Sequence, residues 1–276
     1  MDLLTPQPGA GWSLRLLRDA YTGPAVQVRR SSDNALEDIA FDAHGHFDGG
    51  AFSAFVGSGD GFVHTWYDQS GNGRHAVQTN TARQPQIALN AINGCAAVRF
   101  DGEDDILPLS AGLDLIRALN SATFIFVAST AHSYSVYFNV GMTDTMPSLI
   151  IRGGNNQITE ATTRPLDAAN PIWSVAAGGL YGTGHHIIAT TFDWANGAIY
   201  IWRDGGNYGE SLGNNNAGTR PDTDAYQINL GANRETRFYI DGDITEFLAY
   251  QAALSDEDRQ FLEANHAAYY GLTLAS

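Results

Sequence analysis

Cysteine and basic residues are scarce in this chain. Cys95 is the one cysteine among 276 residues, so no disulfide can form within the chain. It lies in an apolar segment, and we expect it in the core, where free cysteines are commonly found. Only 15 lysine and arginine residues stand against 30 acidic ones, giving a formal net charge of −15. Such a surface repels phosphate backbones and anionic membranes, so nucleic acid is not an expected partner.

Long apolar runs are also missing. No stretch approaches the ~18 apolar residues of a membrane span, so membrane insertion is not expected. Residues 1–9 lack the basic region and the apolar stretch of a secretory signal, which predicts a protein made in a cytoplasm. Residues 1–11 are rich in proline and glycine and are expected to form an N-terminal arm or linker. Residues 12–276 show no internal boundary and are expected to form one domain.

Glycine and aromatic residues are abundant, with 30 Gly, 12 Tyr, 13 Phe and 5 Trp. Asn-Gly and Asp-Gly pairs separate many short β-rich runs and supply the positive φ that two-residue hairpins require. This pattern predicts an all-β sandwich. The runs expected as strands are residues 25–30, 62–67, 96–100, 123–129, 135–140, 148–152, 186–192, 198–203, 225–231 and 243–250.

A few short helices are expected as well. Residues 12–21 carry Leu14, Leu17 and Tyr21 at helical spacing, and residues 50–56 predict a second short helix. Near the C-terminus, Ser255 is a suitable N-cap for a longer helix that Gly271 would end. We expect this last helix to cover an open end of the sandwich.

Several segments of the second half resemble laminin-G and concanavalin A-like domains. They are residues 98–105, 123–127, 199–205 and 242–255, the last of which joins a Gly-Asp-Ile strand to a Leu-Ser helix start. The resemblance implies a concanavalin A-like jelly-roll β-sandwich.

The first half contains the run Tyr-Asp-Gln-Ser-Gly-Asn-Gly at residues 67–73. Together with residues 21–33, this run resembles the catalytic domain of arabinofuranosidase B enzymes, itself a concanavalin A-like sandwich. The same block, opened by Ser-Leu-Arg-x-Leu-Arg-x-Ala-Tyr as in residues 13–21, also resembles bacteriophage virion proteins.

The enzyme resemblance implies two catalytic carboxylates, and both matching positions differ here. Gly154 stands where the family has a glutamate before an Asn-Asn pair, and Asn233 stands in place of the acid/base aspartate. The family's adjacent cysteines are replaced by Val136 and Tyr137. A retaining glycosidase needs two carboxyl groups about 5–5.5 Å apart, so we predict a protein without catalytic residues. The nearby carboxylates that offer substitutes are Asp144, Glu160, Glu235 and Asp241.

The candidate ligand-binding residues are polar side chains at the motif and at the family's site positions. They are Asp68, Arg152, Asn155, Asn156, Asn233 and Arg234. Turn geometry explains Asp68 equally well. Asp101, Asp104 and Asp105 are candidate calcium ligands, since calcium prefers carboxylate oxygens. The favoured alternative is a turn with solvated acids, and no other cofactor is expected.

The leading hypothesis from these features is a non-enzymatic bacteriophage virion structural protein, such as a tail fibre, spike or head decoration. Its lectin-like domain would contact host cell-surface glycan, and its N-terminal arm would bind other virion proteins. A homo-oligomer located in the virion is expected, because such appendages are symmetric assemblies. An arabinofuranosidase-like glycoside hydrolase is the first alternative, and a purely architectural coat component is the second.

Overall fold

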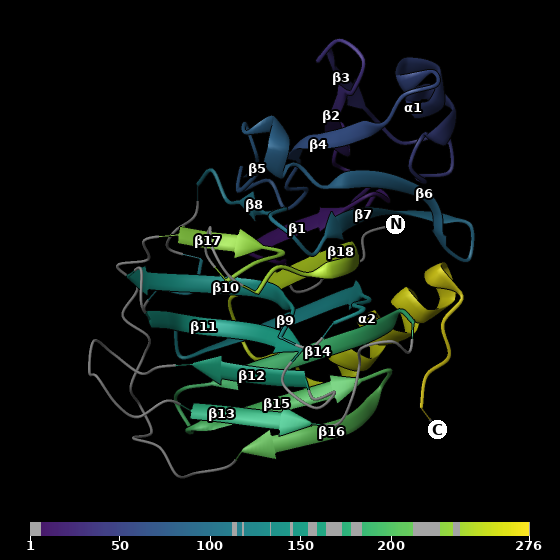
Figure 1. The fold of residues 1–276 in the computed structure, drawn as a ribbon. Helices are drawn as coiled ribbons and strands as arrows, with labels where there is room; N and C mark the ends of the chain where they lie inside the picture. The colour runs from purple at the N-terminus through teal and green to yellow at the C-terminus, as the bar shows by residue number, and fades with distance from the viewer. Residues whose placement is uncertain are drawn as a thin grey trace.

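The computed structural model describes residues 7–111, 115–117, 119–132, 134–143, 146–153, 159–163, 173–177, 184–211, 227–233 and 238–275. Two antiparallel β-sheets form a sandwich, which confirms the predicted fold class (Figure 1). No helix in this described part of the chain has the length and apolarity needed to cross a membrane.

The larger sheet has 12 strands and runs in the order β16-β15-β14-β9-β18-β7-β6-β4-β2-β3, with β1 beside β18 and β5 beside β4. Its strands are β1 (Ala10–Ser13), β2 (Val26–Arg30), β3 (Leu36–Ile39), β4 (Gly61–Trp66), β5 (Ala76–Val77), β6 (Gln86–Ile92), β7 (Cys95–Asp101), β9 (Ser121–Ala128), β14 (His186–Asp193), β15 (Ala198–Arg203), β16 (Gly206–Ser211) and β18 (Asp241–Tyr250).

The smaller sheet has 6 strands in the order β13-β12-β11-β10-β17-β8. Its strands are β8 (Leu107–Pro108), β10 (Val136–Thr143), β11 (Met146–Gly153), β12 (Thr159–Thr163), β13 (Trp173–Ala177) and β17 (Gln227–Leu230). The helices are α1 (Gly49–Val56), the short 3₁₀ helix η1 (Thr81–Arg83) and α2 (Asp256–Tyr270). Every strand predicted from the sequence is found, as are the second and the C-terminal helices.

The central strands of the larger sheet are buried on both faces. In β9, Phe124 and Phe126 point into the main core between the sheets, while Ile125 and Val127 belong to a second apolar cluster under α2. This alternation follows from the two-residue repeat of a strand. Burying each such side chain stabilises the fold by about 1.5–3 kcal/mol. The continuous apolar sequence of β9 therefore needs a covering layer on each side.

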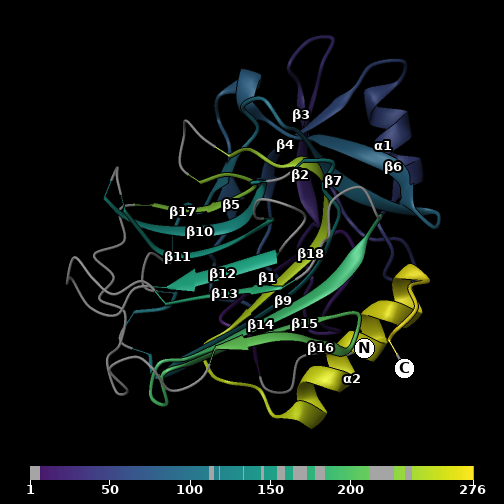
Figure 2. The same ribbon diagram turned by 60° about the horizontal axis from the view of Figure 1, so that its bottom comes forward.

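Helix α2 supplies the outer of these layers. Its caps are those predicted: the Ser255 side chain accepts a hydrogen bond from the N–H of Asp258, and Gly271 takes the left-handed conformation with φ of 63°. The helix packs on the outer face of the larger sheet, where Leu262 and Tyr270 join the second cluster (Figure 2). The expectation that α2 covers an open end of the sandwich was wrong. The apolar side chains that needed a cover, such as Ile125 and Val127, lie on the outer face of the larger sheet.

A buried ionic cluster fixes α2 to the sheet. Glu246 of β18 is fully buried, with Arg15 Nε at 2.6 Å and His266 Nε2 at 2.8 Å from its carboxylate oxygens. Burial opposes ionisation, but the positive charges of Arg15 and His266 hold the pKa of Glu246 well below its usual range. Removing Arg15 would take the guanidinium away from the fully buried Glu246 carboxylate, which is strongly destabilising.

The helix predicted for residues 12–21 is absent. Residues Ala10–Ser13 instead form β1, which pairs antiparallel with β18. Leu14 and Leu17 are buried as the apolar spacing suggested, but in an irregular segment. Because β1 begins at Ala10, the sandwich includes the last residues of the segment expected as an arm.

Hairpin turns contain three of the expected Asn-Gly and Asp-Gly pairs, and one of them is Asn196-Gly197 between β14 and β15, where Gly197 has φ of 68°. Asn93 and Gly94 have φ of 46° and 91° between β6 and β7, and Asp204 and Gly205 have φ of 51° and 84° between β15 and β16. Asp241-Gly242 begins strand β18 and is not a turn, so that expectation was wrong.

Candidate active site

The motif at residues 67–73 is held by the carboxylate of Asp68. This side chain is 2% exposed and accepts hydrogen bonds from the N–H groups of Gly11, Ser70 and Arg74 and from the Ser70 hydroxyl. All four hydrogen bonds of this carboxylate are therefore made within the chain and not to a ligand. The arrangement ties the N-terminal strand to the turn after β4, and it gives Asp68 a structural role.

Gln69 explains why residues 13–17 are not helical. Its side chain is fully buried and makes three hydrogen bonds to the backbone of that segment. Its amide nitrogen donates to the carbonyls of Ser13 and Arg15, each at 3.0 Å, and its oxygen accepts from the N–H of Leu17 at 2.9 Å. The backbone groups that a helix would pair are satisfied by this side chain instead.

Three strands of the smaller sheet meet at one end, where β10 begins and β11 and β17 finish. Val136 pairs with Arg152, and Phe138 pairs with Leu230. Just beyond β17, Gly231 has φ of 88°, and a Cβ there would lie 2.2 Å from the ring of Phe100. Only glycine fits this close approach.

The predicted ligand-binding residues are only partly brought together. Arg152 lies half-buried at the end of β11, and Asn233 follows β17 at 8% exposure with its Oδ1 atom lacking a hydrogen-bond partner. Asp68 lies far from these two residues. It accepts a hydrogen bond from Gly11, and Gly11 pairs with Leu248 of β18. Leu248 lies roughly 20 Å along β18 from Asp241, where that strand begins. Three predicted residues and the glycine at the glutamate position lie outside the described residues, namely Asn155, Asn156, Arg234 and Gly154.

The outer face of the smaller sheet carries a pair of buried amides. Asn139 and Asn229 are directly opposite each other in β10 and β17, and both are fully buried. Neither their amide nitrogens nor their oxygens have a hydrogen-bond partner. A buried polar group without a partner costs about 1–3 kcal/mol. This face of the sheet is therefore built at an energetic cost.

An acidic cavity opens where β7 ends and β18 begins. Asp241, the first residue of β18, pairs with Asp101, the last residue of β7. With Asp105 and Arg99 they line a cavity of about 260 Å³. Asp105 is 6% exposed, and its burial, together with the charges of Asp101 and Asp104, raises the pKa of its carboxyl to about 7. Asp105 therefore binds a proton at a pH where ordinary aspartates have lost theirs.

Asp241 also borders the end of the smaller sheet. Its carboxylate lies 2.9 Å from Nε2 of His132, and its side chain is 37% exposed. Its carbonyl accepts a hydrogen bond from the N–H of Ala131, five residues before the start of β10. The short segment from Ala131 to the start of β10 thus joins the acidic cavity to the strand ends that carry Arg152 and Asn233.

The candidate calcium ligands Asp101, Asp104 and Asp105 do come together, with oxygen atoms within 4.8 Å of one another. Oδ1 of Asp101 accepts hydrogen bonds from the N–H groups of Glu103, Asp104 and Asp105. That is the arrangement of an Asx-stabilised turn, the favoured alternative. Calcium binding by these residues stays a prediction.

Two aromatic residues at the same end have unusual backbones. Tyr134 and Phe238 have φ of 67° and 58°, values that bulky side chains rarely adopt. Such strain costs about 1–3 kcal/mol per residue and concentrates at functional sites. No sequence signal marked either residue, since neither is glycine or asparagine.

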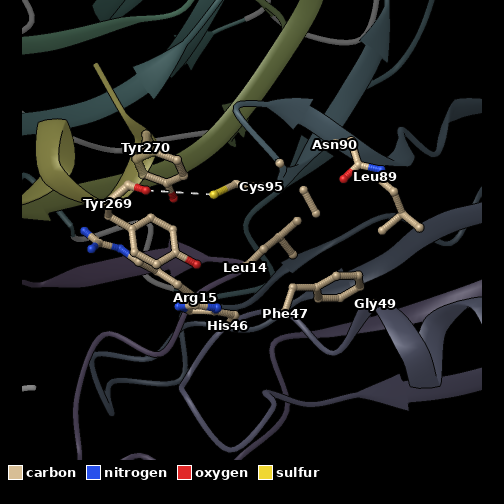
Figure 3. A pocket seen from close by; sticks show the side chains of 12 residues that line it. Leu14, Arg15, His46, Phe47, Gly49, Leu89, Asn90, Cys95, Tyr269 and Tyr270 are labelled. Carbon is tan, nitrogen blue, oxygen red and sulfur yellow. Dashed lines mark hydrogen bonds between the residues drawn. The ribbon is translucent and has the colours of Figure 1, made fainter. Parts of the chain in front are cut away.

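A second cavity, of about 210 Å³, lies beside the end of α2, where Tyr269 and Tyr270 line it (Figure 3). Leu14, Phe47 and Leu89 contribute apolar walls. The guanidinium of Arg15 is bonded to Glu246 and Asn265. Cys95, expected in the core, is half-buried at this cavity, and burial raises the pKa of its thiol. The paired guanidinium of Arg15 and the protonated thiol of Cys95 are therefore poorly suited to catalysis in this cavity.

Comparison with known proteins gives one family match. A family model described as Alpha-L-arabinofuranosidase B, catalytic, matches residues 4–102. A probable alpha-L-arabinofuranosidase B of Aspergillus terreus is 40% identical over 75 residues, which are 27% of this chain and 15% of that protein. The chain thus aligns with about a seventh of the length of this relative.

Solved structures are similar in fold. An arabinofuranosidase complexed with arabinofuranosyl-α-1,2-xylobiose has a TM-score of 0.69 and 17% identity, covering 100% of this chain and 66% of that one. The CBM40 domain of a Ruminococcus gnavus sialidase, bound to α2,3 sialyllactose, has a TM-score of 0.51 and 16% identity, covering 61% of this chain and 95% of that one. At these identities the likeness shows the sandwich fold alone.

These matches correct the hypothesis of a non-enzymatic bacteriophage virion protein. The matching family model describes a catalytic domain, and the matched curated relatives are fungal arabinofuranosidases. The expected virion location is overturned by the same finding. The opening block at residues 13–21, which suggested a phage protein, lies inside the segment that matches the enzyme family.

Proposed function

We propose that this chain is a glycoside hydrolase that removes arabinofuranosyl groups from glycans. The observation that carries the proposal is the match of residues 4–102 to the arabinofuranosidase B catalytic family. The chain covers only a small part of its curated relatives, so activity and substrate are inferred from this segment together with the site's chemistry.

Two carboxyl groups of different character supply the chemistry. Asp105 has a pKa of about 7, raised by burial, and is suited to protonate the leaving oxygen as general acid. Asp241 is exposed to the same cavity, and His132 orients its carboxylate for nucleophilic attack. Asp241 bonds the anomeric carbon as the protonated leaving group departs, which forms a glycosyl ester. Water, deprotonated by Asp105, then attacks this carbon and breaks the ester, which releases the sugar and restores both carboxyl groups.

Arg152 and Asn233 remain proposed ligand-binding residues in this scheme. Both lie at strand ends near the segment that leads to Asp241. The Oδ1 atom of Asn233 is buried and has no hydrogen-bond partner in the chain, so a sugar hydroxyl reaches it only if binding uncovers this atom.

The test is hydrolysis of 4-nitrophenyl α-L-arabinofuranoside and of arabinoxylan by the wild type and by Asp241→Asn and Asp105→Asn. The Asp241 variant should lose at least a thousandfold of kcat/KM on both substrates. The Asp105 variant should lose 10²–10⁴-fold on arabinoxylan and less on the aryl substrate, because nitrophenolate leaves without protonation.

Asp256→Asn is the matched control, because this aspartate is 81% exposed on α2. It should retain wild-type rates. Full activity in both the Asp241 and the Asp105 variants, with unchanged melting temperatures, would show that these carboxyls do not perform the reaction.

A further inference from the structure

Tyr134 and Phe238 form an aromatic pair near the proposed active site. Their ring centroids lie 5.7 Å apart with an interplanar angle of 31°. Phe238 is 37% exposed, one of few large apolar side chains at the surface of the described residues. Both residues keep positive φ angles that asparagine or glycine would adopt more easily. The fold therefore holds two rings at the surface in a conformation that local preference opposes.

A backbone hydrogen bond holds Phe238 beside the strand that follows Tyr134. The carbonyl of Phe238 accepts a hydrogen bond from the N–H of Val136 at 3.1 Å, which joins the segment after β17 to the start of β10. The guanidinium carbon of Arg152 lies 5.8 Å from the Tyr134 ring centroid. Strand β11 thereby supports one ring of the pair, and Arg152 adds hydrogen-bond donors at its edge.

The pair lies a few residues along the chain from Asp241, which lines the acidic cavity. Phe238 precedes Asp241 by three residues, and Tyr134 follows His132, the partner of Asp241, by two. A chain of sugars whose cleaved bond lies at Asp241 would extend over these rings. Sugar rings present apolar C–H faces to aromatic side chains and hydroxyl groups to polar ones, and both kinds of group are present here.

We propose that Tyr134 and Phe238, with Arg152, form a glycan-binding platform for the backbone of a neutral polysaccharide next to the acidic cavity. The inference deepens the proposed function and rests on it. The occupant is a neutral glycan because Asp241, three residues from Phe238, lines an acidic cavity whose carboxylates would repel an anionic ligand.

The experiment is native affinity electrophoresis in gels containing arabinoxylan, which measures binding without any turnover. The variants are Tyr134→Asn and Phe238→Asn, because asparagine tolerates positive φ and so removes the ring without adding strain. Each should weaken binding at least tenfold, equivalent to about 1.4 kcal/mol, with an unchanged or higher melting temperature. Phe261→Ala is the control, since Phe261 is 58% exposed on α2 and should not affect binding.

A second readout uses the wild type alone, in case a variant fails to fold. Arabinoxylan should protect Tyr134 from nitration by tetranitromethane, as measured by peptide mass spectrometry. Equal binding by all variants, or wild-type protein that neither binds arabinoxylan nor gains protection, would overturn the platform. Binding that depends on the two rings in a protein without hydrolysis would support the platform while refuting the proposed function.

Discussion

Replacing Gln69 by leucine tests whether the motif shared with arabinofuranosidases holds the fold or performs chemistry. The side chain makes three buried hydrogen bonds to the backbone of Ser13, Arg15 and Leu17. Leucine has similar volume but leaves these three backbone groups without partners. At about 1–3 kcal/mol for each unsatisfied group, the loss is about 3–6 kcal/mol after partial relaxation. This is a large part of a typical domain's stability.

The assay is urea unfolding followed by tryptophan fluorescence. Gln69→Leu should lower the midpoint strongly with little change in the slope of free energy against urea. Gln27→Leu is the matched control, since its amide bonds only Asp38 at the surface, and it should change stability by less than about 0.5 kcal/mol. A Gln69→Leu protein with wild-type stability but lost glycan hydrolysis would refute the structural role.

Two further predictions concern buried polar groups. Asn229→Leu should stabilise the protein by about 1–3 kcal/mol, because it removes a buried amide without partners. Thermal unfolding measures this gain. Asn196→Leu is the control and should give no gain in stability, because the amide of Asn196 is hydrogen-bonded to Asp193. Asp105 has a folded pKa of about 7 against an ordinary 3.8, so its contribution to stability is complete below pH 3.8 and is lost as pH rises towards 7. Asp105→Asn should flatten this part of the stability–pH curve measured by urea unfolding, and an unchanged curve would contradict the assignment.

The sandwich was predictable because its signals are local. Strands such as β14 and β15 show short β-rich runs ended by Asn-Gly or Asp-Gly pairs, and α2 carries its own caps. The helix predicted for residues 12–21 was wrong because the spacing of Leu14 and Leu17 indicates only that they are buried. The backbone conformation of this segment depends on Gln69, which lies far along the chain. Helix propensity is a weak preference that such contacts override.

The site was predicted less well, for a related reason. Arg152 and Asn233 were predicted as ligand-binding residues from a family pattern, and the structure places both at strand ends of one sheet. The sequence marked Asp105 as a candidate calcium ligand and not as an acid, because its pKa rises through burial, which the sequence does not reveal. Asp241 was noted as one substitute among several, and only the pairing of β7 with β18 sets it beside Asp101.

The most direct test of the account is covalent labelling of the nucleophile. An α-L-arabinofuranosyl cyclic sulfate is an electrophile that a catalytic carboxylate opens to form a stable ester, and peptide mass spectrometry locates the ester. We predict one modified carboxylate at Asp241, with turnover of the aryl arabinofuranoside lost in proportion to labelling. A protein that neither turns over the substrate nor reacts with the probe, or one that reacts at a carboxylate outside the acidic cavity, would contradict it.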